Sequence, residues 1–264
     1  MGFATYSNHR PDEQPTGEAN AVSVNVSKTL AKCFGYMAIA LVITALSAFG
    51  VGLLFTKLIF ADYIFAGEIT GMNAAAFVGY MVVMIASFLL LVIDSFVMTK
   101  MVAKPNRSAW IPYIIYAILM GVFLSSFLVF GVDFATIGEA AGISAAVFGA
   151  LFLVGWFSKK DLNVWAYIGI SFLSILFFFG IFGLLLWVFL PGAGLVYNLI
   201  FSLALAVVLL IVIATDVFNI RRIIERGGSS DNLALYCAFV MYGDFVVIFV
   251  RILYYLTLLK DDSN

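Results

Sequence analysis

Two aspartates lie inside long apolar stretches of the sequence, where an ionisable side chain is costly. Asp216 stands in IATDVFNI, and Asp244 stands 28 positions later in VMYGDFVVIFV. A charged side chain at the centre of a membrane helix costs about 2.5–3.5 kcal/mol even on lenient insertion scales, so such a residue is by default a functional candidate. Neither aspartate has a basic residue three or four positions away, where a helix would bring one within reach. Each therefore needs a partner on another helix or in water.

The composition indicates that these carboxylates lie in a membrane protein. Of the 264 residues, 64% are hydrophobic and only 11% are charged, which lies outside the range of soluble globular proteins. The lipid bilayer is thus an expected partner. No basic aromatic surface is present that would favour nucleic-acid binding. The two cysteines, Cys33 and Cys237, have no metal-ligand spacing and are interpreted as small buried side chains.

Long runs without charge predict seven transmembrane helices, because a spanning helix needs roughly 20 apolar residues. Five runs of this kind are 33–56, 69–93, 108–132, 140–158 and 232–259, the last containing Asp244 and Arg251. The uncharged stretch from Leu162 to Thr215 is long enough for two spans, and LPGAGL at 190–195 supplies a break between them. The predicted fold class is an all-α integral membrane protein with seven transmembrane helices.

The division of the chain and its orientation follow from the polar residues. Residues 1–27 are interpreted as a polar, flexible cytoplasmic tail, and residues 28–264 as the transmembrane domain. The positive-inside rule places the N-terminus in the cytoplasm and the C-terminus outside. The basic residues that then lie inside are Arg10, Lys28, Lys32, Lys100, Lys104, Arg107, Lys159, Lys160, Arg221, Arg222 and Arg226, and those outside are Lys57 and Lys260.

The depth of the two aspartates can be measured from the same membrane edge, since the loop RRIIERGGSSDN joins spans six and seven. At 1.5 Å per residue, Asp216 lies about 15 Å and Asp244 about 18 Å from the cytoplasmic edge. Two facing carboxylates at one depth would share a proton and titrate as a unit. When both are ionised, they would form a transient site for a hard cation. The alternative is structural: each aspartate fills a packing defect or pairs with a basic loop residue.

Three further charged residues lie in or beside the spans. Arg251 follows Asp244 by two helical turns on the same face, so it either balances the charge of the pair or extends to the outer interface. Asp94 and Lys100 are interpreted as solvated residues at the cytoplasmic end of span two.

Catalysis is not predicted, and no cofactor is expected. The stretch YGD resembles part of the Gly-x-Gly-Asp motif of presenilin-type intramembrane aspartyl proteases, which is a remote alternative. However, Met241 occupies the first glycine position, Thr215 stands where a tyrosine usually precedes the first aspartate, and the Pro-Ala-Leu signature is absent. The only histidine is His9, so the serines of FLSSF have no intramembrane histidine for a dyad. They are interpreted as helix-packing or backbone-bonding groups.

Several longer motifs carry a resemblance that covers nearly the whole chain from Lys28. These are YAILMGVFLSSFLVF, SKKDLNVWAYIGI, ATDVFNIRRI and NLALYCAFVMYGDFVVIFVRIL. Together they resemble the transmembrane Bax inhibitor motif family, also called the Bax inhibitor-1 proteins, and in particular its bacterial members of the plasma membrane. The resemblance implies a fold in which the last helix is central and wrapped by the other six. It also implies a pH-sensitive calcium leak whose paired aspartates match Asp216 and Asp244.

The sequence departs from the family pattern at three places. Relatives that leak calcium often carry an arginine at the cytoplasmic end of span two that latches onto the first aspartate, whereas here Thr99 occupies that position with Lys100 beside it. A lysine lacks the guanidinium fork, so a latch would be weaker or differently aimed. The usual DFINLF reads DFVVIF, with Val247 replacing asparagine, and Arg251 comes about one turn early. Thr99, Lys100, Arg251 and Asp94 are therefore candidate latch or charge-balancing residues.

Two functional hypotheses follow. The first is a calcium leak channel or transporter, with calcium ions and protons as its partners and with Asp216 and Asp244 as pH sensor and transient calcium site. The second is a regulatory protein that binds another membrane protein, such as a membrane protease.

Overall fold

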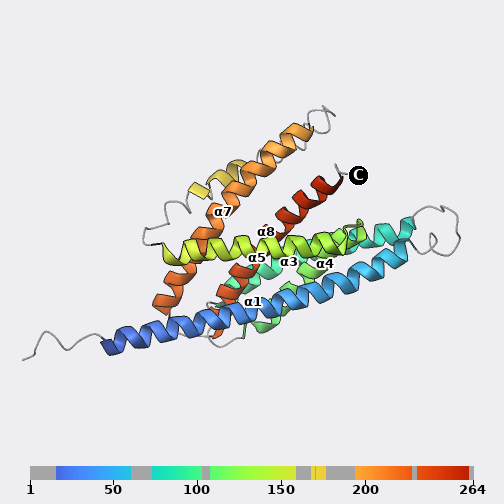
Figure 1. Cartoon of the computed structure of the whole chain (residues 1–264). Coiled ribbons are helices and arrows are strands. Elements are labelled where there is room, and N and C mark those ends of the chain that lie inside the picture. Colours follow the sequence, from blue (N-terminus) through green and yellow to red (C-terminus); the bar gives the residue numbers. More distant parts are fainter. Residues whose placement is uncertain are drawn as a thin grey trace, which may run out of the picture.

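The structure is a computed structural model, and long helices make up nearly all of what it describes. It describes residues 16–60, 73–102, 108–158, 168–169, 171–176, 194–227 and 231–261. Six long helices are α1 (Thr16–Ile59), α3 (Ala74–Val102), α4 (Trp110–Val129), α5 (Phe134–Phe157), α7 (Gly194–Gly227) and α8 (Asp231–Asp261) (Figure 1). Residues 171–176 are also helical, and these described ranges contain no strand. The predicted all-α fold is confirmed for them.

Each of these six helices is long and apolar enough to cross a membrane. Five of them overlap the five separate runs predicted from the sequence, and α7 covers the second half of the long uncharged stretch. The fifth predicted span falls largely outside the described residues, so the count of seven stays a prediction. Most of the predicted break at 190–195 also lies outside them, but α7 begins at Gly194.

The first helix begins earlier than the first apolar run. It starts at Thr16, so residues 16–27 of the polar N-terminal stretch are helical, and its candidate membrane segment is Val26–Ile59. Good helix formers such as Glu18, Ala19 and Ala21 account for this extension.

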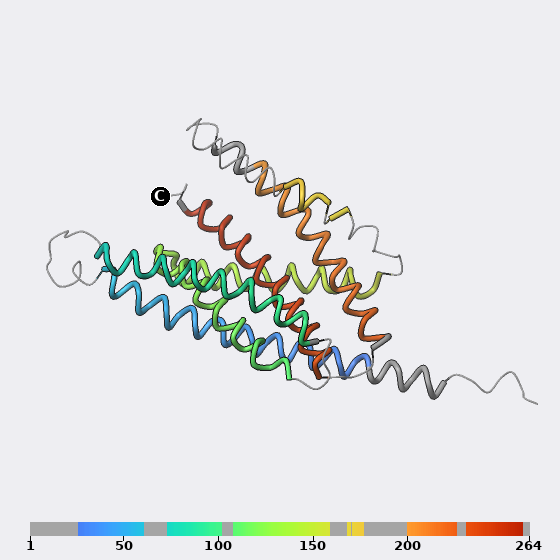
Figure 2. Tube along the Cα trace, turned by 180° about the vertical axis from the view of Figure 1, so that it is seen from behind, coloured from blue at the N-terminus to red at the C-terminus, as the bar shows by residue number. Residues whose placement is uncertain are grey.

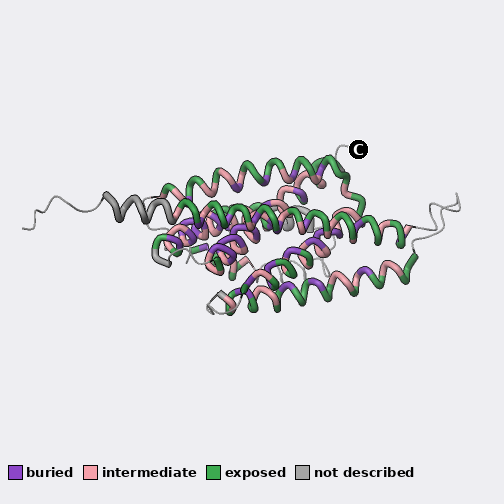
Figure 3. The backbone as a smooth tube through the Cα atoms, turned by 90° about the horizontal axis from the view of Figure 1, so that it is seen from below, coloured by how far each residue is buried: buried purple, intermediate pink, exposed green. Residues whose placement is uncertain are grey.

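The last helix runs between other helices in the described part of the chain. In two opposite views α8 runs between α7 on one side and α1, α3 and α4 on the other (Figures 1 and 2). It packs against all five of the other long helices. Buried positions gather on the helix faces that point inward, and exposed positions on the outward faces (Figure 3). The buried faces include Leu235, Met241 and Tyr242 of α8, none of which is accessible.

Two glycines bring neighbouring helices into close contact. A Cβ at Gly155 of α5 would lie 2.5 Å from the Ala214 carbonyl oxygen of α7. A Cβ at Gly121 of α4 would lie 2.5 Å from the Thr44 carbonyl oxygen of α1. Both positions therefore need glycine, as is usual where membrane helices approach closely. The contact at Gly155 holds α7 against α5 just before Asp216.

Hydroxyl groups between the helices form hydrogen bonds with one another or with backbone carbonyl oxygens. Tyr80 of α3 and Ser125 of α4 are 3.0 Å apart through their hydroxyl oxygens. Ser125 also donates to the Val122 carbonyl at 2.6 Å, and Ser126 donates to the Phe123 carbonyl at 2.9 Å. The interpretation of these two serines as backbone-bonding groups is confirmed.

At the end of the bundle where α8 stops, Asp133 caps α5. Its carboxylate accepts hydrogen bonds from the backbone N–H of Ala135 and the hydroxyl of Thr136, each at 3.0 Å. These bonds, with Lys260 nearby, hold the pKa of Asp133 below its ordinary value. Lys260 donates to Thr136 at 2.7 Å and lies 3.3 Å from Glu139. The last turn of α8 is thereby attached to the first turn of α5.

Candidate functional site

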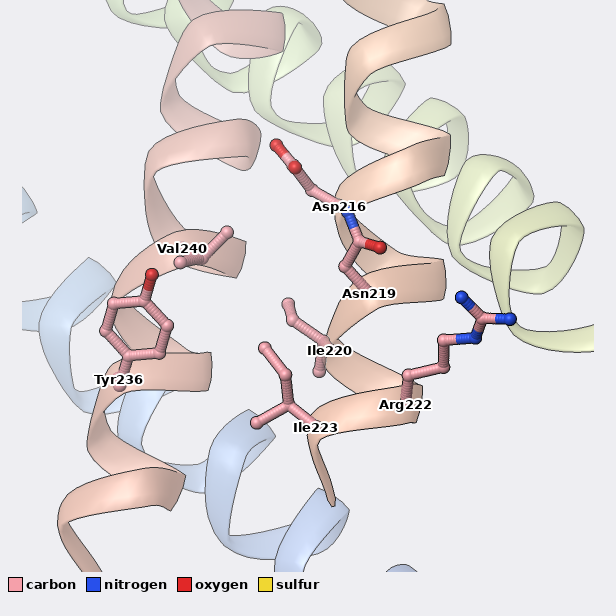
Figure 4. A pocket seen from close by; sticks show the side chains of 7 residues that line it. All are labelled: Asp216, Asn219, Ile220, Arg222, Ile223, Tyr236 and Val240. Atoms are coloured by element: carbon pink, nitrogen blue, oxygen red, sulfur yellow. The ribbon is translucent and has the colours of Figure 1, made fainter. Parts of the chain in front are cut away.

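A cavity of about 430 Å³ lies between α7 and α8, and Asp216 forms part of its wall. The remaining lining residues are Asn219, Ile220, Arg222, Ile223, Tyr236 and Val240. The Asp216 side chain points into the space between the two helices and Val240 faces it from α8, whereas Arg222 points away (Figure 4). The Arg222 guanidinium lies 4.9 Å from the centre of the Phe218 ring. The lining thus combines polar and apolar side chains, and Asp216 supplies its carboxylate.

The second predicted aspartate faces the same side of α8. Tyr236, Val240 and Asp244 follow one another at intervals of four residues, which places them along one helix face. Asp244 lies near enough to Asp216 for the two carboxylates to interact electrostatically. Its Oδ2 atom is buried and has no hydrogen-bond partner among the described residues. The structure thus places the two predicted carboxylates near each other. One oxygen of Asp244 is buried without a hydrogen bond among the described residues.

Asp94 differs from the solvated flank residue expected from the sequence. Its Oδ2 atom is also buried and without a hydrogen-bond partner in the described part of the chain. On α4, Tyr116 lies close enough to interact electrostatically with Asp94. The Tyr116 ring contacts α8 through Phe239, at 4.8 Å between centroids, and Tyr242, at 6.0 Å. This face of α8 is opposite the one that carries Asp244.

The two candidate latch residues of α3 lie away from the aspartates. Thr99 and Lys100 are both exposed. The Thr99 hydroxyl donates to the Ser95 carbonyl of its own helix at 2.9 Å. Within the described ranges Lys100 forms no ion pair with Asp216 or Asp244. The structure therefore shows no latch from this helix.

Arg251 points toward α7. Its guanidinium nitrogen lies 3.5 Å from the Ser202 hydroxyl, and that hydroxyl lies 2.9 Å from the Tyr255 hydroxyl. Arg251 and Asp244 are two turns apart on one face of α8, and both face α7. The guanidinium is thus placed along the interface that holds the carboxylate pair.

The sequence did not predict the roles of three polar side chains near the two carboxylates, which belong to Tyr236, Tyr116 and Arg221. Tyr236 lines the cavity and Tyr116 lies near Asp94, but a tyrosine in an apolar run gives no signal of either role. Arg221 pairs with Glu225 at 2.8 Å and also donates to the Trp156 carbonyl of α5. The spacing of four residues could have predicted the first contact, whereas the second depends on tertiary packing.

The long apolar helices of the described fold define a multi-pass α-helical membrane protein. A family model described as "inhibitor of apoptosis-promoting Bax1" matches residues 26–261. The chain belongs to this family, the Bax inhibitor-1 family, as the resemblance of its motifs predicted. Comparisons with curated proteins and with solved structures gave no match.

Proposed function

We propose that this protein is a pH-sensitive calcium leak channel or transporter of the plasma membrane, with Asp216 and Asp244 as its sensor and transient cation site. One observation carries the proposal. Asp244 has a buried oxygen without a partner beside a second carboxylate that opens into a cavity. An intramembrane carboxylate with no protein partner is suited to bind a proton or a metal cation.

The proposed cycle depends on the charge of the pair. When both carboxylates are ionised, two like charges face each other in an apolar interior, and a cation between them would offset that cost. A shared proton would remove most of the attraction for calcium and allow the helices to close. Calcium takes six to eight oxygen ligands, so water in the cavity would supply the remainder during passage. Binding at the pair is accordingly weak and transient.

The proposal includes the seven-helix arrangement with its N-terminus in the cytoplasm. Support comes from the family, from the contacts of α8 with every other long helix described, and from the distribution of basic residues along the sequence. In this orientation the cavity beside Asp216 lies toward the cytoplasmic half of the membrane. Rearrangement of α7 against α8 would open it to the cytoplasm.

The proposal is tested by calcium flux into liposomes that contain the purified protein and a trapped calcium indicator. The expected result is a flux above that of protein-free liposomes, rising as the pH is raised. A matched sample of heat-unfolded protein controls for leakage caused by damaged bilayers. If the folded protein carries no calcium at any pH, the leak is excluded, and regulation of another membrane protein becomes the function to pursue.

A further inference from the structure

On each of two helices, a buried cysteine is followed four residues later by a buried methionine. Cys33 and Met37 of α1 stand four residues apart, and so do Cys237 and Met241 of α8. This spacing places each thiol and its methionine on one helix face, one turn apart. Cys33, Cys237 and Met241 are 0% exposed and Met37 is 5% exposed. All four belong to one core cluster.

The two pairs meet across the interface between α1 and α8. The Cys33 and Cys237 side chains lie close enough to interact. Lys32 contacts Asp231 at 2.7 Å toward the start of α8, and Thr44 contacts Tyr242 at 2.6 Å further along both helices. The helices therefore run in the same direction, and each methionine lies one turn beyond its thiol on the same side.

We propose that Cys33, Met37, Cys237 and Met241 form a binding site for a soft monovalent cation, Cu(I) or its analogue Ag(I). Thiolate and thioether sulfur are the ligands that such cations prefer, whereas calcium and magnesium take oxygen ligands. A monovalent cation that displaces one thiol proton leaves the charge of the buried site unchanged. That exchange avoids the large cost of placing a net charge in an apolar interior. The site uses neither aspartate of the proposed calcium leak.

An exposed ion pair at the start of α8 adjoins this site. Lys32 immediately precedes Cys33, and its partner Asp231 is the first residue of α8. Their side chains are 49% and 66% exposed, so the pair is solvated and easily exchanged. The sulfur side chains themselves are buried, so we expect a cation to enter from this end only when α1 and α8 separate locally.

The site is tested by titrating the reduced, detergent-purified protein with Ag(I) in chloride-free buffer and recording the ultraviolet sulfur-to-metal absorption. One equivalent is expected to bind, with an increase in the unfolding temperature. Cys33→Ser, Cys237→Ser and the double variant Met37→Leu, Met241→Leu are each expected to bind on the order of tenfold more weakly. Met98→Leu is the matched control, because Met98 is equally buried but lies on α3. Its binding is expected to equal that of the wild type.

A second measurement needs no variant, which matters if a cysteine change prevents folding. Bound Ag(I) is expected to slow alkylation of Cys33 and Cys237 by a membrane-permeant maleimide, as read by mass spectrometry. The proposal is overturned if the wild type takes up no stoichiometric Ag(I), or if the cysteine variants bind as it does. Alkylation unchanged by Ag(I), or oxidation of the two thiols to a disulfide in place of binding, would also overturn it. Unchanged binding by the double methionine variant would contradict the four-sulfur site.

Discussion

The Tyr242 hydroxyl of α8 lies 2.6 Å from the Thr44 Oγ1 of α1, and Thr44 also donates to the Ala117 carbonyl of α4 at 3.0 Å. A hydroxyl has one proton to donate, so Tyr242 is the donor in the first bond. Three helices are thereby joined at one buried point. Asp244, two residues beyond Tyr242, faces α7 on the other side of α8. One face of α8 is thus fixed by hydrogen bonds, while the opposite face borders the cavity.

Removing the Tyr242 hydroxyl tests how much its hydrogen bond to Thr44 contributes to stability. Tyr242→Phe is expected to lower the free energy of unfolding by about 1 kcal/mol, because it leaves buried Thr44 without its donor. Thermal unfolding in detergent measures the change. Tyr254→Phe is the control, since Tyr254 is partly exposed on the same helix. Equal stability of the two variants would show that the bond contributes nothing to folding.

The contact between α5 and α7 is tested with two glycines of the same helix. Gly155→Ala is expected to destabilise the protein by about 1–3 kcal/mol, because its Cβ would lie 2.5 Å from the Ala214 carbonyl and 2.8 Å from the Val217 Cβ. Gly149→Ala meets no atom within 4 Å and is expected to be neutral or stabilising. The measurement is the unfolding temperature of each variant, which is expected to be lower for Gly155→Ala than for Gly149→Ala. The opposite order would contradict the close packing of these helices.

Asp94 provides a test of the unpartnered carboxylates. Asp94→Asn is expected to leave the unfolding temperature unchanged or higher at mildly alkaline pH, because the amide keeps the shape and removes a buried charge. Asp231→Asn is the comparison, since it removes an exposed ion pair and is expected to change stability by less than about 1 kcal/mol. A marked loss of stability in Asp94→Asn alone would mean that the ionised carboxylate has a stabilising partner.

The cap of α5 predicts a pH dependence of stability. Hydrogen bonds from Ala135 and Thr136 lower the pKa of Asp133, so the folded state favours its ionised form. The resulting stabilisation is present above the ordinary aspartate pKa of about 3.9 and is lost as the pH falls through the lowered folded value. Asp133→Ala is therefore expected to unfold at a lower temperature than the wild type at neutral pH, with a smaller difference in strong acid. A difference that does not change with pH would contradict this origin.

The spans could be predicted because a charge-free run of about 20 residues has few alternatives to a membrane helix. The ends of the helices were less predictable. α1 begins before its apolar run, because residues of good helix propensity such as Glu18, Ala19 and Ala21 precede it, and α3 continues past its run to Val102. That Asp216 and Asp244 lie on neighbouring helices was also predictable, since one short loop joins α7 and α8.

Features that depend on three or more helices could not be predicted. Asp94 lies near Tyr116 of α4, and Tyr116 is positioned by its own contacts with α8. The orientation of Thr99 toward Ser95, away from the aspartates, depends on the rotation of α3 in the bundle. Likewise, the two cysteines are 204 residues apart, and the parallel packing of α1 and α8 brings them near each other.

The most direct test of the account is the pH profile of calcium flux in liposomes for the wild type, Asp216→Asn and Asp244→Asn, from about pH 5 to about pH 8. Asp231→Asn serves as the matched control, because it also removes one carboxylate from α8, at an exposed position. The account predicts that flux rises with pH in the wild type and the control, and that either change within the pair flattens the profile. A profile that keeps its pH dependence in both pair variants would contradict the role of Asp216 and Asp244 as the sensor.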